Sequence, residues 1–213
     1  MYPSDKFPTP PLSVIEEFLA THAYAKILAA SRTQSPQATI IPYTIQGSLS
    51  VPNDAVVEVH LVDGDPTLQA LNNNAAATVL VDQLLSFIPH AVFDPTDGNR
   101  AMILFRAVLL HGRAEISDRT DDITDGLERL IQRLEPDSPF DPVTVERYGT
   151  RVTRLRHVRI RVEGIEAKWK LAQDQPANVR QDIIAFLDAR DLPLDRETRA
   201  ILLEYWSRLG LDR

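Results

Sequence analysis

The chain has 213 residues, of which 44% are hydrophobic, and a formal net charge of −7. This composition fits one folded domain, alone or with a small helical appendage. The acidic balance argues against broad binding to nucleic acids or anionic membranes, and no apolar run approaches the roughly 20 residues that span a bilayer. The absence of cysteine excludes disulfides, thiolate metal sites and cysteine nucleophiles. Because the N-terminus has no signal-peptide core, we expect a cytoplasmic protein.

The first half of the chain predicts two helices and a series of strands. One helix follows Pro11, where apolar residues recur at helical spacing, and a short one follows the turn at Pro66. Pro42 places the strand that contains it at an edge or a bulge. Alternating or β-branched runs predict strands at residues 24–30, 38–45, 55–62, 76–81 and 85–93.

The second half contains the longest strand candidate, residues 100–116. It is almost wholly apolar from 101 to 110, which indicates burial on both faces. A strand at 154–171 closes the sheet, and helices are predicted at 123–134, at 143–148 and after Pro176 and Asp195. Many strands with helices at the ends favour a mainly β, α+β fold built on an antiparallel barrel, rather than βαβ units.

Residues 160–173, which read IRVEGIEAKWKLAQ, form the most informative segment. Side chains two apart on a strand point to the same face. The apolar residues are even-numbered before Gly164 and odd-numbered after it, and a one-residue bulge at Gly164 explains the switch. Lys168 and Lys170 then project together, roughly 7 Å apart, with Trp169 on the other face. This spacing suits an anion such as a phosphate; a solvated strand face has the same pattern.

The five histidines do not have the spacing of a metal site. No pair has the i, i+4 helical arrangement of a zinc site, so we predict none. His60 lies on the polar face of its strand, either as a surface residue or as part of a site. His111 and Arg113 share a strand face, and an arginine with two lysines is chemically suited to one phosphate; an exposed strand end is the alternative.

Arg106 interrupts the apolar run of the longest strand. A buried arginine is costly unless it is paired. It therefore meets a carboxylate, crosses a subunit interface or contacts a bound anion. A second set of arginines, between Arg151 and Arg161, is either a solvated strand face or a local contact for nucleic acid, which the overall charge does not support.

Several short motifs together resemble the PaiB-type FMN-binding split-barrel family. The family's closing motif, I-E-G-K-W-K-L-S-Q-N, is matched by Ile165, Glu166, Lys168, Trp169, Lys170, Leu171 and Gln173. Its opening motif is matched by Met1, Tyr2, Pro3 and Phe7, and two internal elements by His60, Leu61 and Pro66 and by His111, Gly112 and Arg113.

The resemblance implies an antiparallel, Greek-key split β-barrel over residues 1–175, with an N-terminal helix and an inserted helix at 121–148. Residues 176–213 would form a helical appendage packed on the barrel. It also implies a homodimer that holds FMN, or a related phosphorylated ligand, at its interface. The cofactor-binding residues would be Lys168, Trp169, Lys170 and Gln173, with His60, Arg106, His111 and Arg113 as further candidates.

The chain departs from the family at several polar positions. Asp63 and Asp65 stand in an element where the family has Arg and Asn, and residues 103–107 keep none of the family's polar atoms. A flavin-free dimeric regulatory or interaction protein on the same scaffold is therefore the alternative, since the family includes negative transcriptional regulators. The residues alone require no enzyme; an enzyme of this kind would be a flavin-dependent oxidoreductase.

Overall fold

The computed structural model describes residues 6–30 and 35–211. Met1, Tyr2 and Pro3 of the predicted opening motif lie outside these ranges. No helix within the described ranges has the length and the apolar character that crossing a membrane requires.

The strands of the described residues form one sheet with the order β2-β1-β5-β6-β7-β4-β3. The pairs with a defined register, β1 with β2 and β5, and β4 with β3 and β7, are all antiparallel. The strands are β1 Tyr24–Ala29, β2 Gln37–Pro42, β3 Thr44–Gln46, β4 Val56–Val62, β5 Ala76–Ile88, β6 Met102–Ser117 and β7 Leu155–Lys170. The predicted class, a mainly β fold with C-terminal helices, is confirmed.

Helices precede the sheet, interrupt it and follow it. They are α1 Leu12–Thr21, α2 Pro66–Asn73, α3 Thr120–Leu134, α4 Val145–Tyr148, α5 Thr150–Thr153, α6 Ala177–Arg190 and α7 Pro193–Arg208, with single 3₁₀ turns η1 His90–Val92 and η2 Gly98–Arg100. Pro42 ends the edge strand β2, as its missing N–H predicted.

Two strand predictions were wrong. Residues 38–45 were expected as one strand, but they divide between β2, which ends at Pro42, and β3, which begins at Thr44, and these strands form opposite edges of the sheet. Residues 76–81 and 85–93 were expected as two strands, but β5 runs without interruption from Ala76 to Ile88. Its alternation breaks where Leu85 and Ser86 are both buried, and there the Ser86 N–H donates to Thr198 Oγ1 at 3.0 Å. A polar stretch and a shift in the alternation of buried residues lie inside this one strand, and together they led to the prediction of two strands.

The described residues fall into two compact units. Unit 1 comprises residues 6–10, 82–107 and 167–211, and unit 2 comprises residues 11–30, 35–81 and 108–166. Strands β5, β6 and β7 contribute residues to both. The predicted boundary between residues 175 and 176 stays a prediction.

In unit 2, α3 packs against β4 and β3. Its buried residues are Ile123, Gly126 and Leu130, while Leu134 at its end is 40% exposed. The helix therefore faces the sheet through a side that carries a glycine and, three and seven residues later, Arg129 and Arg133. This polar inner face was not predicted from the apolar pattern alone.

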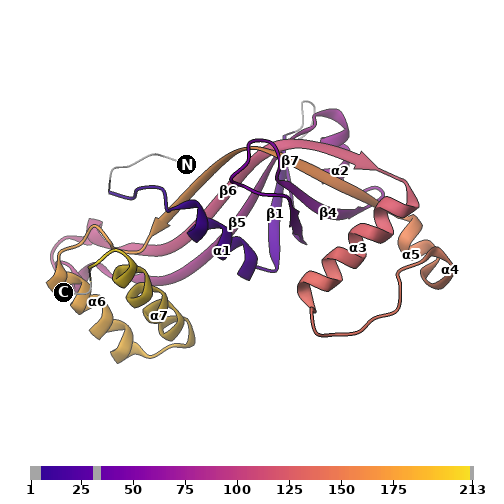
Figure 1. The fold of residues 1–213 in the computed structure, drawn as a ribbon. Coiled ribbons are helices and arrows are strands. Elements are labelled where there is room, and N and C mark those ends of the chain that lie inside the picture. The colour runs from indigo at the N-terminus through magenta and orange to yellow at the C-terminus, as the bar shows by residue number, and fades with distance from the viewer. Residues whose placement is uncertain (1–5, 31–34, 212–213) are drawn as a thin grey trace. The chain divides into compact units, whose positions relative to one another are not determined.

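In unit 1, α6 and α7 form an antiparallel pair, drawn in yellow-brown to yellow in Figure 1. Asp195, which is 1% exposed, fixes the start of α7. It accepts from the Leu192 N–H at 3.1 Å and pairs with Arg190 at 2.5 Å, and it also accepts from the Ser86 hydroxyl at 2.6 Å. This set of contacts holds the pKa of Asp195 down at about 2, chiefly through Arg190, and attaches α7 to β5.

Candidate functional site

The end of β7 carries the two lysines that the sequence singled out. Ala167, Trp169 and Leu171 are buried at 8%, 1% and 0% exposure, while Lys168 and Lys170 between them are half-buried. The alternation thus places both lysine side chains on one face of the strand, with their Cα atoms roughly 7 Å apart. The predicted faces of these residues are therefore confirmed.

The predicted change of phase near Gly164 is also present. Val158, Ile160 and Val162 are buried before it, and Ala167 and Trp169 after it. Gly164 is absent from the glycines with positive φ, so the switch does not depend on a backbone conformation reserved for glycine.

The two lysines differ in their surroundings. The Lys168 ammonium lies 5.2 Å from the centre of the Phe7 ring, within the range of a cation–π contact. Lys170 forms no ion pair or hydrogen bond with any residue that the structure describes. A half-buried ammonium without a partner in this part of the chain is a charge that an anionic ligand can neutralise.

Gln173 acts on the backbone that carries the lysines. Its Oε1 accepts from the Leu171 N–H at 2.8 Å and its Nε2 donates to the Trp169 carbonyl at 2.7 Å. Ala172 has a φ of 55°, so the chain turns sharply there. Gln173 therefore closes the turn after β7 and holds the strand end in place.

Arg106 lies in unit 1 and belongs to a polar chain of three residues. Its guanidinium donates to the Gln83 side-chain oxygen at 3.0 Å, and the Gln83 amide donates to Glu197 of α7 at 2.6 Å. Of the partners expected for Arg106, these contacts show an amide, which leads on to the carboxylate of Glu197.

His111 and Arg113 lie in unit 2. The His111 ring contacts Glu166 Oε1 through Nε2 at 2.9 Å and Thr78 Oγ1 through Nδ1 at 3.1 Å, so it links β5, β6 and β7. Arg113 is exposed. Neither contact of His111 requires a ligand.

His60 is buried, contrary to its expected place on an open polar face. It is 8% exposed, because the residues of β4 from Val56 to Leu61 are buried on both faces of the strand. His60 lies directly opposite His157 on β7, and the two rings stack with centroids 5.0 Å apart. None of their four ring nitrogens has a hydrogen-bond partner among the described residues.

Gly126 of α3 covers this histidine pair. A Cβ atom at this position would lie 2.8 Å from His60 Nε2 and 2.9 Å from His157 Nε2. Burial, and then the neighbouring His157, lower the pKa of His60 to about 4, with a smaller opposing influence from the Ile123 carbonyl. Burial also lowers the pKa of His157, against the attraction of Glu58. Both rings are therefore neutral near pH 7.

Glu58 carries the charge of this layer. It is 3% exposed and binds Arg129 of α3 through both carboxylate oxygens, at 2.9 Å and 3.1 Å. His157 and Arg159 approach it at 3.7 Å. The sequence reasoning missed Glu58, Arg129 and His157; a glycine inside an amphipathic helix was the one signal of a close approach.

The two acids that replace family residues have structural roles. Asp65 caps α2 by accepting from the Thr67 N–H at 2.7 Å, and Pro66 takes the first helical position. Asp63 pairs with Arg156 at 3.2 Å. Their presence is thus explained by local folding of unit 2.

The eight predicted site residues fall into two sets. Unit 1 holds Lys168, Trp169, Lys170, Gln173 and Arg106, and unit 2 holds His60, His111 and Arg113. No three His, Asp or Glu side chains among the described residues are arranged to hold a metal ion. The set on β7 is the candidate ligand site, because His60 is sealed and His111 is already bonded.

Comparisons with known proteins agree with the architecture. The chain is similar to the flavocytochrome Anf3 of Azotobacter vinelandii, with 15% identity, a TM-score of 0.58 and coverage of 75% of this chain and 67% of that one. It is also similar to the FAD and haem binding protein of Mycobacterium smegmatis, with 18% identity, a TM-score of 0.59 and coverage of 78% and 73%. At these identities the likeness concerns the fold.

No curated protein is significantly similar to this chain in sequence. The sequence profile of a family described as "Putative FMN-binding domain" matches residues 1–181. That match includes the closing motif on β7 and every predicted site residue. The chain therefore belongs to this FMN-binding split-barrel family, as its motifs predicted.

Proposed function

We propose that the chain binds FMN and that Lys168 and Lys170 hold the phosphate. The observation that carries the proposal is the pair of half-buried ammonium groups on one face of β7, in a chain that belongs to an FMN-binding family. Two lysines whose Cα atoms lie roughly 7 Å apart on one face of a strand can both reach the oxygens of one phosphate dianion. Partial burial strengthens that attraction over its value in open water.

The neighbouring residues of β7 support this role by fixing the strand. Trp169 is 1% exposed, so we assign it the role of anchoring the strand end, with its ring packed on the opposite face. Gln173 closes the following turn through two backbone hydrogen bonds. When bound, the flavin ring would supply electron or hydride transfer, and the protein its position and electrostatics.

The similar proteins add support for a flavin, though not for FMN in particular. One is named a flavocytochrome and the other an FAD and haem binding protein. Both accommodate a flavin on a fold of this kind. The choice of FMN over FAD rests on the family description and on the predicted motif.

We also propose that the protein is a homodimer. Three large apolar side chains on the adjacent strands β5 and β6 of unit 1 are exposed: Leu84 at 61%, Phe87 at 51% and Ile103 at 42%. Exposed apolar residues grouped on neighbouring strands are typical of an interface. Sedimentation equilibrium should give a dimer, and replacing Leu84 with Glu should shift it toward monomer.

Titration with FMN tests the ligand. Flavin fluorescence should change with saturable binding to the wild-type protein, and Lys170→Gln should weaken binding by about tenfold or more, the size expected for one charge-assisted contact. Lys26→Gln, on β1 of unit 2, is the matched control and should bind normally. A protein that takes up no FMN would favour the flavin-free dimeric interaction or regulatory protein on the same scaffold.

A further inference from the structure

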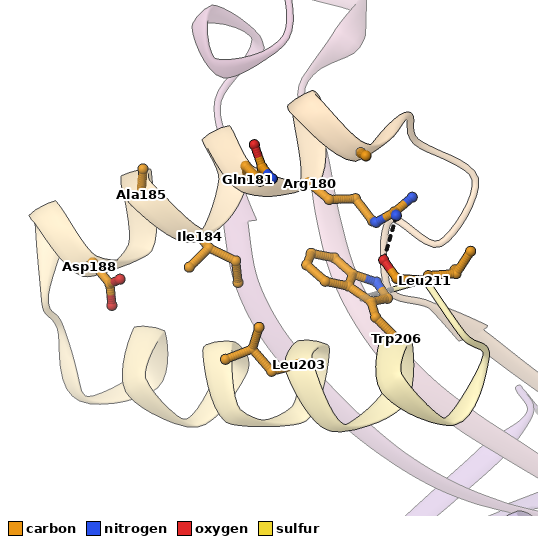
Figure 2. A pocket seen from close by; sticks show the side chains of 9 residues that line it. Arg180, Gln181, Ile184, Ala185, Asp188, Leu203, Trp206 and Leu211 are labelled. Carbon is orange, nitrogen blue, oxygen red and sulfur yellow. Dashed lines mark hydrogen bonds between the residues drawn. The ribbon is translucent and has the colours of Figure 1, made fainter. Parts of the chain in front are cut away.

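A groove of about 370 Å³ lies between α6 and α7. Figure 2 shows Ile184 of α6 and Leu203 of α7 facing each other across it, with Arg180 and Trp206 near one end and Asp188 toward the other. Its volume is in the range of small-molecule sites. Most of its lining lies beyond residue 181, where the family match ends, so the family description assigns it no role.

Arg180 is the unusual residue of this groove. It is 8% exposed, and its guanidinium donates to the carbonyl oxygens of Gln175 and Leu211, each at 2.6 Å. It also lies 5.6 Å from the centre of the Trp206 ring. Within the described part of the chain, it has no carboxylate partner.

Two other arginines of the helix pair have carboxylate partners, which the described residues do not offer Arg180. Arg190 is paired with Asp195, and Arg199 with Asp188, at 2.5 Å and 2.8 Å. Arg180 is more buried than either, yet among the described residues its positive charge is met by two carbonyl dipoles and an aromatic ring and by no carboxylate. A buried unpaired charge is costly, and a guanidinium has five N–H donors, so donors remain for an anion.

The rest of the groove is apolar. Ile184, Ala185 and Leu203 line it with aliphatic carbon, and Trp206 presents a ring whose N–H is already bonded to the Leu171 carbonyl at 2.8 Å. A ligand here needs one anionic end and an apolar body.

The position of Asp188 determines which way such a ligand can lie in the groove and how long it can be. It follows Arg180 by eight residues on α6, which is about 12 Å along a helix. Its carboxylate would repel a second negative group, although Arg199 offsets part of that charge. The groove therefore favours a molecule with one charged end and a chain of about this length.

We propose that the groove between α6 and α7 binds a medium-chain aliphatic monocarboxylate, with its carboxylate on Arg180 and its chain between Ile184 and Leu203. This site is separate from the proposed phosphate contacts on β7 and does not depend on them. It would give the protein a second small-molecule ligand of acidic, lipid-like character.

Calorimetric titration with decanoate, below its micelle concentration, tests the proposal. Decanoate should bind saturably and at least about tenfold more tightly than decanol, which lacks the charge. Trp206 is one of two tryptophans in the chain, so tryptophan fluorescence should change along the same curve. Measurements with and without FMN keep this result independent of the flavin.

Two variants locate the site without disturbing the buried contacts of Arg180. Leu203→Asp adds a negative charge to the groove wall at a position that is 42% exposed, and should abolish decanoate binding. Leu194→Asp has the same exposure on the same helix but does not line the groove, and should bind normally.

Four results would overturn the proposal. Equal affinity for decanoate and decanol would show that Arg180 does not select an anion. No saturable binding of decanoate would contradict the proposal, and a change in sedimentation with Leu203→Asp alone would assign the groove to a protein contact instead. Arg180→Gln should reduce decanoate binding while retaining decanol binding, and retained decanoate binding would contradict the assignment.

Discussion

Buried charges are paired differently in two regions of the molecule. One region is the layer of α3, β4 and β7 in unit 2, and the other is the end of β7 with α6 and α7 in unit 1. In the first, the buried carboxylate of Glu58 is bound at both oxygens by Arg129. In the second, neither cation has a carboxylate partner among the described residues: Arg180 contacts two carbonyls and the Trp206 ring, and Lys170 has no polar partner.

This difference separates structural charges from those available to ligands. His60, which belongs to one of the family motifs, lies in the sealed layer, where its ring contacts another histidine and a helix. The buried Arg180 and the half-buried Lys170 of unit 1 lie where an anion can still reduce an electrostatic cost. Substitutions of the charges and buried rings in unit 2 should therefore change stability, whereas substitutions of the available cations in unit 1 should change ligand binding.

Acidification should destabilise the sealed layer most. The pKa of His60 is about 4 in the folded chain against 6.5 ordinarily. The unfolded chain therefore binds the proton more readily, and stability is complete above pH 6.5 and is lost as the pH falls toward 4. The loss is roughly 3 kcal/mol. His157, with its pKa lowered too, acts in the same direction.

Urea unfolding of the wild type and of His60→Leu between pH 7.5 and 4.5 measures this effect. The variant should lose much of the pH dependence in this window, whereas His90→Gln, in unit 1, should retain it. The groups that face the pair are Glu58, Arg129, Arg159 and Asp122. Equal pH dependence of wild type and His60→Leu would contradict a buried neutral ring.

Glu58→Gln should cost about 2 kcal/mol of unfolding free energy. Removing one member of a buried ion pair leaves the other charge uncompensated, although Arg129, whose side chain is 38% exposed, can partly turn to water. Denaturant titration at pH 7 is the measurement, with the exposed Glu163→Gln as control. A loss no larger than that of the control would show that the pair contributes little.

Gly126→Ala should destabilise the protein by about 1 to 2 kcal/mol, although alanine usually favours a helix interior. The new methyl group would meet His60 and His157 at less than van der Waals distance. Gly98→Ala, where nothing lies within 4 Å, is the control. A more stable Gly126→Ala protein would mean that α3 does not pack tightly on the histidines.

Lys170→Gln should change the unfolding free energy by less than about 0.5 kcal/mol, since the residue has no polar partner among the described residues. The same substitution should still weaken FMN binding. Thermal unfolding without ligand, run beside the FMN titration, separates the two effects. A marked loss of stability would place Lys170 among the structural charges.

The sequence predicted what alternation along one strand can show. The facing of Lys168 and Lys170, the burial of Trp169 and the shift of phase near Gly164 were all readable from residues two apart. The edge position of Pro42 followed equally from its missing N–H.

What the sequence did not show depends on contacts between elements. The polar face of β4 alternates like an exposed one, and only the approach of α3 through Gly126 buries His60. The groove beside Arg180 likewise requires the spacing of α6 and α7, which no single helix pattern contains. The paired role of Glu58 arises from residues 71 apart in the chain.

The affinity of the wild-type protein for FMN compared with riboflavin tests the central claim most directly, because the two ligands differ only in the phosphate. If Lys168 and Lys170 hold that phosphate, FMN should bind at least about tenfold more tightly, and added salt should reduce the difference. Equal affinities at low salt would contradict the phosphate site on β7.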